Sequence, residues 1–284
     1  MKTRHWKEAL CSVDDPDIAR AFTFITNLNR VNWQYLLPSG RGRVALCIGE
    51  GMGTTAHGLA GNYATVVAVE RVLSRVEFMR RRFSQDEVKN VRIVRAAFPD
   101  LPFAQDSFDL VVFNGVVEGL PSGQPSAPPT EVQLAGLRKA YWLLKPGGNV
   151  YVGIENRWCY EYFLGAKDPH IGLRWVTILP RRMANWLTRR STGHRYDTYL
   201  YGSRGYRRLF EQAGFTETQV FIAKDSYNNP ESIVPLTGGP SQYYFRSLDV
   251  KAQNVHRRLF HVVAARLGLL GHMQYAFVVI GTKR

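Results

Sequence analysis

The sequence predicts an α/β fold of the doubly wound type, with helices covering both faces of a mostly parallel sheet. Short apolar runs alternate with amphipathic helical stretches along most of the 284 residues, and this alternation is typical of βαβ units. The runs are apolar enough for strands that are buried on both faces. With 45% hydrophobic residues, the chain can bury a sizeable core without disulfides or a metal ion.

The main domain is expected to span residues 40–284 and to contain seven strands with helices between them. The strands are predicted at 44–48, 66–69, 91–94, 108–113, 150–154, 218–222 and 275–280. The helices are predicted after Thr54, from Leu73, over 131–144 and over 204–213. Gly214 ends the last of these helices.

Residues 1–39 are expected to form a helical N-terminal extension. One amphipathic helix is predicted over residues 17–37, and Pro38-Ser39-Gly40 ends it. Its apolar side carries Ile18, Phe22, Ile25, Leu28 and Trp33.

Two insertions interrupt the α/β pattern, at about residues 157–203 and 226–272. The first follows the fifth strand and is rich in aromatic residues and arginines, so we expect it to cap the substrate site. The second follows the sixth strand and contains an amphipathic helix that packs on the domain or touches a membrane surface. A proline-rich stretch, residues 121–129, is predicted to be a loop near the site, either a lid or a plain connection.

The formal charge of +14 is concentrated in one part of the chain. Nine arginines and a single acid, Asp197, lie between Arg174 and Arg208. Such a block predicts an anionic neighbour, which is a phosphorylated or nucleotide-linked substrate, an anionic membrane surface or nucleic acid, unless the block is only a solvated basic surface. No RNA-binding signature, zinc finger or helix-turn-helix is present in the sequence.

Cysteine usage and the apolar runs predict a cytoplasmic protein. The three cysteines, Cys11, Cys47 and Cys159, are far apart and outside any Cys-x-x-Cys pair, which argues against zinc and against a disulfide framework. The first residues lead into no signal peptide, and no apolar run of about 18 residues is present. We therefore expect no metal site.

The strongest functional signal is a glycine turn, Gly49-Glu50-Gly51-Met52-Gly53, directly after the first strand. Glycines allow a tight turn and a close approach of the backbone to a ligand. Glu70 ends the next strand, where a carboxylate can accept hydrogen bonds from both hydroxyls of a ribose. Thr54 stands where a dinucleotide site needs glycine, which favours S-adenosylmethionine over NAD because S-adenosylmethionine has no pyrophosphate.

This turn resembles the first motif of class I S-adenosylmethionine-dependent methyltransferases, which have a Rossmann-like, seven-stranded fold. Three later segments are similar to the type 11 branch of that superfamily: Leu101-Pro102-Phe103 with Ser107-Phe108-Asp109-Leu110-Val111-Val112, then Asn114-Gly115-Val116-Val117-Glu118, and Leu143-Leu144-Lys145-Pro146-Gly147-Gly148. A narrower resemblance begins at Gly153-Ile154-Glu155-Asn156-Arg157 and is to a bacterial subgroup associated with cell-surface glycan assembly.

The resemblance implies a set of residues around S-adenosylmethionine. Gly49, Gly51 and Gly53 lie under the methionine part. Glu70, followed by Arg71, binds the ribose, and Phe98, preceded by Ala97, offers a backbone N–H to the adenine. Asn114, Gly115 and Val116 face the methionine and the transferred methyl group. Glu50 stands where the family tolerates a small residue, and its carboxylate could instead face the positively charged amino group or the sulfonium. The family commonly has acids where this chain has Cys47 and Ala97.

Methyl transfer from a sulfonium is an in-line displacement, so alignment of the acceptor is the main requirement. A base is needed only if the acceptor must lose a proton. His170 is the first candidate for this base because histidine titrates near neutrality, and Glu155 and His194 come next.

The leading hypothesis is methyl transfer to a hydroxyl of a small-molecule or glycan acceptor. The arginine block motivates a nucleic-acid methyltransferase as the alternative, although an Asn/Asp-Pro-Pro-Tyr-type motif is absent. Cys47 and Ala97 motivate a second alternative, a non-catalytic S-adenosylmethionine-binding protein. The sequence leaves the acceptor, the methylated atom and the oligomeric state open.

Overall fold

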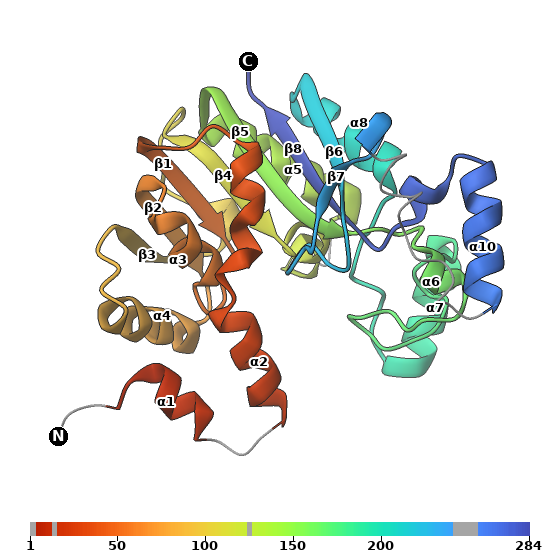
Figure 1. Cartoon of the computed structure of the whole chain (residues 1–284), viewed down its shortest axis with the longest axis horizontal. Helices are drawn as coiled ribbons and strands as arrows, with labels where there is room; N and C mark the ends of the chain where they lie inside the picture. The colour runs from red at the N-terminus through yellow and green to blue at the C-terminus, as the bar shows by residue number, and fades with distance from the viewer. Residues whose placement is uncertain (1–3, 13–15, 124–126, 241–254) are drawn as a thin grey trace.

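A single mixed sheet of eight strands forms the centre of the structure, a computed structural model that describes residues 4–12, 16–123, 127–240 and 255–284. The strand order is β3-β2-β1-β4-β5-β8-β6-β7. The strands are β1 (Gly40–Ile48), β2 (Tyr63–Glu70), β3 (Val91–Arg95), β4 (Phe108–Asn114), β5 (Leu144–Glu155), β6 (Glu217–Ala223), β7 (Ile233–Pro235) and β8 (Ala276–Thr282). Figure 1 shows helices on both faces of this sheet.

The predicted doubly wound architecture is confirmed. Strands β1 to β5 pair in parallel, whereas β8 runs antiparallel between β5 and β6. The expected count of seven strands was one too low, because β7 adds a short antiparallel edge strand beside β6. Three residues that end in a proline are too short to give a recognisable strand pattern.

The main helices agree with the pattern, and several short ones add to it. They are α1 (Trp6–Cys11), α2 (Pro16–Thr26), α3 (Thr54–Ala60), α4 (Leu73–Gln85), α5 (Pro129–Leu143), α6 (Tyr160–Phe163), α7 (Arg181–Thr192), α8 (Ser203–Ala213) and α10 (Val255–Arg266). Short 3-10 helices are η1 (Leu28–Leu36), η2 (Phe98–Asp100), η3 (Val117–Gly123) and η5 (Leu270–Met273). The predicted proline-rich loop therefore begins as the 3-10 helix η3, and its residues 124–126 lie outside the described residues.

The core lies on both faces of the sheet because side chains alternate along each strand. In β1, Leu46 and Ile48 belong to one buried cluster with Leu137 of α5, whereas Cys47 belongs to the other cluster with Leu59 of α3. Both layers pack up to the carboxyl end of β1. This packing holds the glycine turn between α3 and the start of the loop after β4.

The N-terminal extension packs against the sheet, but the helix predicted over 17–37 is not continuous. Helix α2 ends at Thr26, and the Asn27 side chain accepts a hydrogen bond from the Asn29 backbone N–H (3.0 Å), which caps η1. Asparagine competes with helical hydrogen bonds in this way, so it breaks the helix where the apolar periodicity alone predicts continuity. Trp33 is fully buried and stacks on Tyr151 of β5 at a centroid separation of 3.6 Å.

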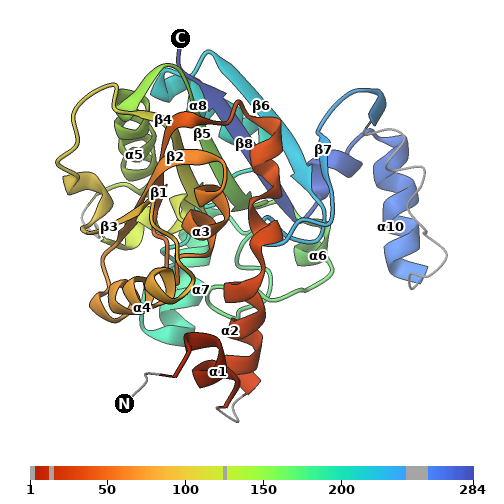
Figure 2. The same ribbon diagram turned by 60° about the vertical axis from the view of Figure 1, so that its left-hand side comes forward.

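The two insertions lie at one end of the molecule. The first, which we call the cap (residues 157–203), contains α6 and α7 and has a small core of its own formed by Val176, Ala184 and Tyr196. The second contains α10, which stands away from the sheet in both views (Figures 1 and 2) and exposes Leu259 and Val263. Within the described ranges, no helix is both long and apolar enough to cross a membrane.

Candidate functional site

The glycine turn has a backbone geometry that excludes larger residues. Gly49, Gly51 and Gly53 all have positive φ values, +66°, +62° and +79°, a region that glycine adopts without steric cost. A Cβ on Gly49 would lie 2.9 Å from Val116, and one on Gly53 would lie 2.6 Å from the ring of Phe83. These glycines let the turn pass close to the residues that follow β4.

Glu70 supports this turn from the neighbouring strand. Its side chain is 3% exposed. One carboxylate oxygen accepts from the Gly51 backbone N–H (2.9 Å) and the other from the Val72 backbone N–H (2.9 Å). Because each carboxylate oxygen has two lone pairs, Glu70 can accept two further hydrogen bonds from a ligand diol.

A cleft of about 670 Å³ lies at the carboxyl ends of the parallel strands, the expected place for a ligand in a doubly wound fold. Seven of the predicted cofactor residues line it: Gly49, Glu70, Arg71, Ala97, Phe98, Gly115 and Val116. Glu50, Gly51, Gly53 and Asn114 are not among its lining residues. The cleft therefore brings together the side of the predicted site that serves a nucleoside.

A second carboxylate, Glu50, lies inside the turn beside Cys47. Its Oε1 atom accepts from the Ala56 backbone N–H (3.1 Å), whereas its Oε2 atom is buried without a hydrogen-bond partner. Burial raises the pKa of Glu50 to about 7, although the Ala56 N–H and the guanidinium of Arg30 oppose this shift. Burial, together with the adjacent Glu50 carboxylate, raises the pKa of the Cys47 thiol well above its usual value. Cys47 is therefore a neutral neighbour of this carboxylate.

Arg30 is a site residue that the sequence did not reveal. It belongs to η1 in the extension, and one of its terminal nitrogens donates to the Asn228 side chain, while its Nε is buried without a hydrogen-bond partner. Asn114 at the end of β4 also has a buried amide nitrogen without a partner, and its Oδ1 atom lies 3.5 Å from the Tyr151 hydroxyl. The methionine end of the predicted site thus contains two buried donors without partners, on Arg30 and Asn114, and one buried acceptor without a partner, on Glu50. A ligand that carries both a carboxylate and an ammonium group could pair with all three.

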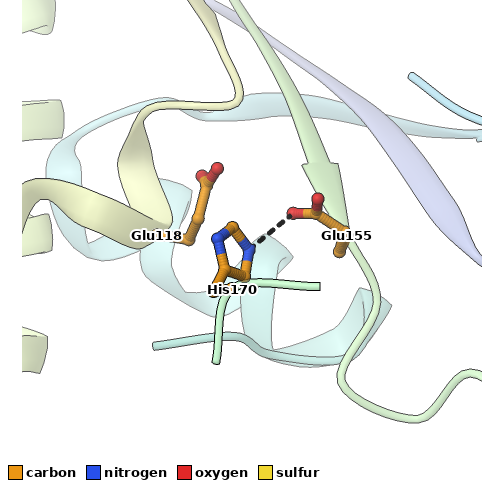
Figure 3. Close-up of side chains that lie close together, drawn as sticks. All are labelled: Glu118, Glu155 and His170. Atoms are coloured by element: carbon orange, nitrogen blue, oxygen red, sulfur yellow. Dashed lines mark ion pairs between the residues drawn. The ribbon is translucent and has the colours of Figure 1, made fainter. Parts of the chain in front are cut away.

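Three titratable side chains from different elements meet beyond this end. Glu118 comes from η3, Glu155 ends β5, and His170 lies in the cap; we call them the carboxylate–histidine cluster (Figure 3). His170 Nε2 lies 3.8 Å from Glu155 Oε2. Burial raises the pKa of Glu118, and Glu155 adds to this shift. Glu155 also raises the pKa of His170.

Tyr227 links the cluster to the end of β4. Its hydroxyl donates to Glu155 Oε1 (3.1 Å). A Cβ on Gly115, where φ is +71°, would lie 2.5 Å from the same hydroxyl oxygen. The side chain of Tyr227 therefore lies between the cluster and Gly115, the residue that is expected to face the transferred methyl group.

The structure brings together two of the three predicted base candidates. His170 and Glu155 lie in the cluster, whereas His194 is exposed after the C-terminal end of α7 and lies outside it. Glu118 was visible in the sequence only as the last residue of a family-like segment, and nothing there gave it a role. Glu118 lies close to His170 only because the cap folds over η3.

Many cap arginines have structural partners. Arg181 donates to the Thr198 carbonyl and lies over the rings of Tyr196 and Tyr199, and Arg174 donates to the Gly165 carbonyl. The predicted arginine block is therefore partly a set of internal contacts. The exposed part on α7 consists of Arg182, Arg189 and Arg190.

Comparison with known proteins agrees with this geometry. Residues 45–148 match a family model described as a methyltransferase domain. A segment of 111 residues is 32% identical to the demethylmenaquinone methyltransferase of Clavibacter sepedonicus, and it covers 39% of this chain and 40% of that protein. The chain therefore matches well under half the length of this curated relative.

Solved structures show the same fold over nearly the whole chain. A methyltransferase of Thermotoga maritima, described as a possible histamine N-methyltransferase, has a TM-score of 0.54 and 19% identity, over 94% of this chain and 95% of that one. Geranyl diphosphate methyltransferase in complex with S-adenosylmethionine has a TM-score of 0.52 and 13% identity, over 98% and 94% of the two chains. The fold is that of class I methyltransferases, and residues 45–148 of the chain match a methyltransferase domain.

Proposed function

We propose that this protein transfers the methyl group of S-adenosylmethionine to a hydroxyl of a small-molecule acceptor, such as a sugar or a lipid-linked saccharide. The observation that carries this proposal is the position of the carboxylate–histidine cluster, which Tyr227 joins to the methionine end of the cofactor cleft. A hydroxyl has to lose its proton on methylation, and the cluster offers groups that can accept one.

The residues of the cleft suit the ribose and the adenine of the cofactor. Glu70 would accept from the ribose hydroxyls with Arg71 beside it, and the backbone of Ala97 and Phe98 would hold the adenine. The cofactor supplies a methyl group on a sulfonium. By holding the nucleoside, these residues would fix the position of that methyl group, which is the main requirement of an in-line displacement.

The unpaired groups at the methionine end support the assignment. Arg30 and Asn114 have buried donors for a carboxylate, and Glu50 has a buried acceptor for an ammonium group. The methionine part of S-adenosylmethionine carries both a carboxylate and an ammonium group, whereas NAD carries neither group. Gly115 and Val116 complete the wall of the cleft near the methyl group.

The absence of the usual acid at Ala97 does not prevent adenine binding. Asp100, in the same 3-10 turn, lines the cleft, and we propose that it accepts from the adenine amino group. A hydrogen bond of this kind is worth about 0.5 to 1.5 kcal/mol, so a displaced acceptor can compensate for the missing one.

On the acceptor side, His170 would take up the hydroxyl proton and Glu155 would orient the imidazole ring and stabilise its charge. This arrangement follows the general logic of a base held by a carboxylate. Proteins similar to this chain include a demethylmenaquinone methyltransferase and a geranyl diphosphate methyltransferase, which supports a small acceptor. Nucleic acid is the weaker alternative because many cap arginines bind inside the cap.

Cofactor binding gives the first test. Calorimetry with S-adenosylmethionine should give a Kd that rises roughly tenfold or more in Glu70→Gln, because charge-assisted hydrogen bonds to the ribose are lost. Glu77→Gln, an exposed carboxylate on α4, is the matched control and should bind as the wild type does. Absence of binding by the folded wild-type protein would refute the proposed function.

Transfer of labelled methyl groups gives the second test. Sugars, sugar phosphates, lipid-linked saccharides and short RNA and DNA should be offered separately. Labelling of a saccharide hydroxyl, lost in His170→Asn while cofactor binding persists, is the expected result. Labelling of nucleic acid alone would favour the alternative.

A further inference from the structure

The carboxylate–histidine cluster has the composition of a metal site. Two carboxyl groups and one imidazole each offer a ligand atom, and these atoms all lie within 4.8 Å of one another. Figure 3 shows the imidazole of His170 between the carboxyl groups of Glu118 and Glu155. The three residues come from η3, β5 and the cap, so tertiary folding assembles the cluster.

Each of the two carboxyl groups has a buried oxygen that accepts no hydrogen bond from a described residue. Glu118 is 3% exposed and Glu155 is 4% exposed, and the Oε2 atom of each is buried without a hydrogen-bond partner. In the part of the chain that the structure describes, no lysine or arginine forms an ion pair with either carboxyl group, and His170 is the partner of Glu155. Buried carboxylates are costly unless a cation or several donors compensate them.

We propose that Glu118, Glu155 and His170 bind one divalent cation of the Mn²⁺ type. Two carboxylate oxygens with one imidazole nitrogen suit Mn²⁺ or Fe²⁺ better than Ca²⁺, which prefers oxygen ligands alone. Ligand atoms about 2.1 Å from such a cation lie about 3.0 Å apart when adjacent and about 4.2 Å apart when opposite, so each side chain would have to move inward by up to about 1 Å to close the cluster onto it. The added positive charge would balance the two carboxylates.

The geometry leaves room for further ligands. The His170 side chain is about one-third exposed, so solvent reaches the cluster at His170, whereas Glu118 and Glu155 are buried. A cation held by three protein ligands has open positions for water or a substrate oxygen, as in catalytic metal sites.

The role of the cation rests on the proposed function. Tyr227 places the cluster one side chain from the predicted methyl position. A bound cation would hold the acceptor hydroxyl there and lower its pKa, with the proton passing to solvent. His170 would then serve as a ligand, and the direct uptake of the proton by His170 is the alternative that the experiment separates.

Metal binding should be measured first on the full chain after treatment with a chelator. Titration with Mn²⁺ alone should show one site per chain by calorimetry and by electron paramagnetic resonance. Glu118→Gln should weaken this binding at least tenfold, because a neutral amide is a poor ligand. It should still fold, because the amide has the shape of the carboxyl group and carries no charge that burial would penalise. Glu131→Gln, an exposed acid in the first turn of α5, is the matched control and should retain the site.

Two results would overturn the proposal: no Mn²⁺ binding to the wild-type protein at millimolar concentration, or equally tight binding by Glu118→Gln. S-adenosylmethionine binding measured on the same samples tells a failure of the metal site from a failure of the proposed function. A protein that binds the cofactor but no Mn²⁺ keeps the proposed function and loses the metal site. A protein that binds Mn²⁺ but no cofactor loses the proposed function and keeps the metal site.

Discussion

Glu50 occupies an unusual position among the residues of the glycine turn, because it supplies a carboxylate next to the neutral Cys47. Strand β1 carries Cys47, and the carboxylate lies in the turn, where its Oε2 atom has no hydrogen-bond partner. Since burial raises the pKa of Glu50 to about 7, the residue changes its charge in the physiological range. We therefore propose that its ionisation links cofactor binding to pH.

We predict that the affinity for S-adenosylmethionine rises with pH, because only ionised Glu50 pairs with the ammonium group. Between about pH 6 and pH 7.5 the ionised fraction of a carboxyl group with this pKa rises roughly eightfold, and the association constant should rise equally. Calorimetry across this range measures the change. Glu50→Gln should bind more weakly at the upper end and lose the slope, and a slope that persists in this variant would contradict the assignment.

The same shift has a consequence for stability without the cofactor. A raised carboxyl pKa means that the folded state binds the proton more strongly than the unfolded chain does. The contribution of Glu50 to the free energy of unfolding therefore falls as the pH rises from its ordinary pKa near 4.5 to about 7. Glu50→Gln should be more stable than the wild type at pH 8 in urea unfolding, and lower stability of the variant would contradict this sign.

At the scale of elements, the N-terminal extension and the cofactor turn are joined by Arg82 of α4. Its guanidinium donates to the carbonyls of Ile25 in α2 and Met52 in the turn, both at 2.8 Å, and it forms an ion pair with Asp86 at 3.7 Å. The side chain is 1% exposed. One buried cation thus fixes the turn relative to the extension that carries Arg30.

Arg82→Met should therefore weaken both folding and cofactor binding. Removal of one partner from a buried charged network costs about 3 to 5 kcal/mol, because the other groups remain buried and unpaired. Urea unfolding and calorimetry measure the two effects. Arg81→Met, the exposed neighbour, should change neither by more than about 0.5 kcal/mol. An Arg82 variant of wild-type stability would refute the role of this network.

The elements differ in how far the sequence predicts them. The strands that form the centre and the glycine turn follow from local apolar runs and from Gly49, because burial on both faces leaves a continuous pattern. The break at Asn27 was missed because its side-chain cap competes with an apolar period that continues through Trp33. Arg30, Glu118 and Tyr227 were missed as site residues because tertiary folding alone brings them together. Nothing local distinguishes such residues from ordinary surface groups.

Considered as a whole, the molecule has its cleft at the carboxyl edge of the sheet, lined by residues that follow β1, β2, β3 and β4 and by α5. Of the arginine block, Arg174 and Arg181 bind carbonyl groups inside the cap, whereas Arg182, Arg189 and Arg190 surround the exposed Trp186 on α7. A cytoplasmic location and contact with an anionic membrane remain predictions.

The exposed arginines of α7 should carry polyanion binding without taking part in the reaction. We predict that replacing Arg182, Arg189 and Arg190 by glutamine sharply reduces retention on heparin and lowers the salt dependence of nucleic-acid binding by about 2 to 3 in slope. The Kd for S-adenosylmethionine should not change, because these side chains lie outside the lining of the cleft. The matched control replaces the exposed Arg80, Arg81 and Arg92. An equal loss of retention in both triple variants would show that only net charge matters and that α7 is not a specific anionic surface.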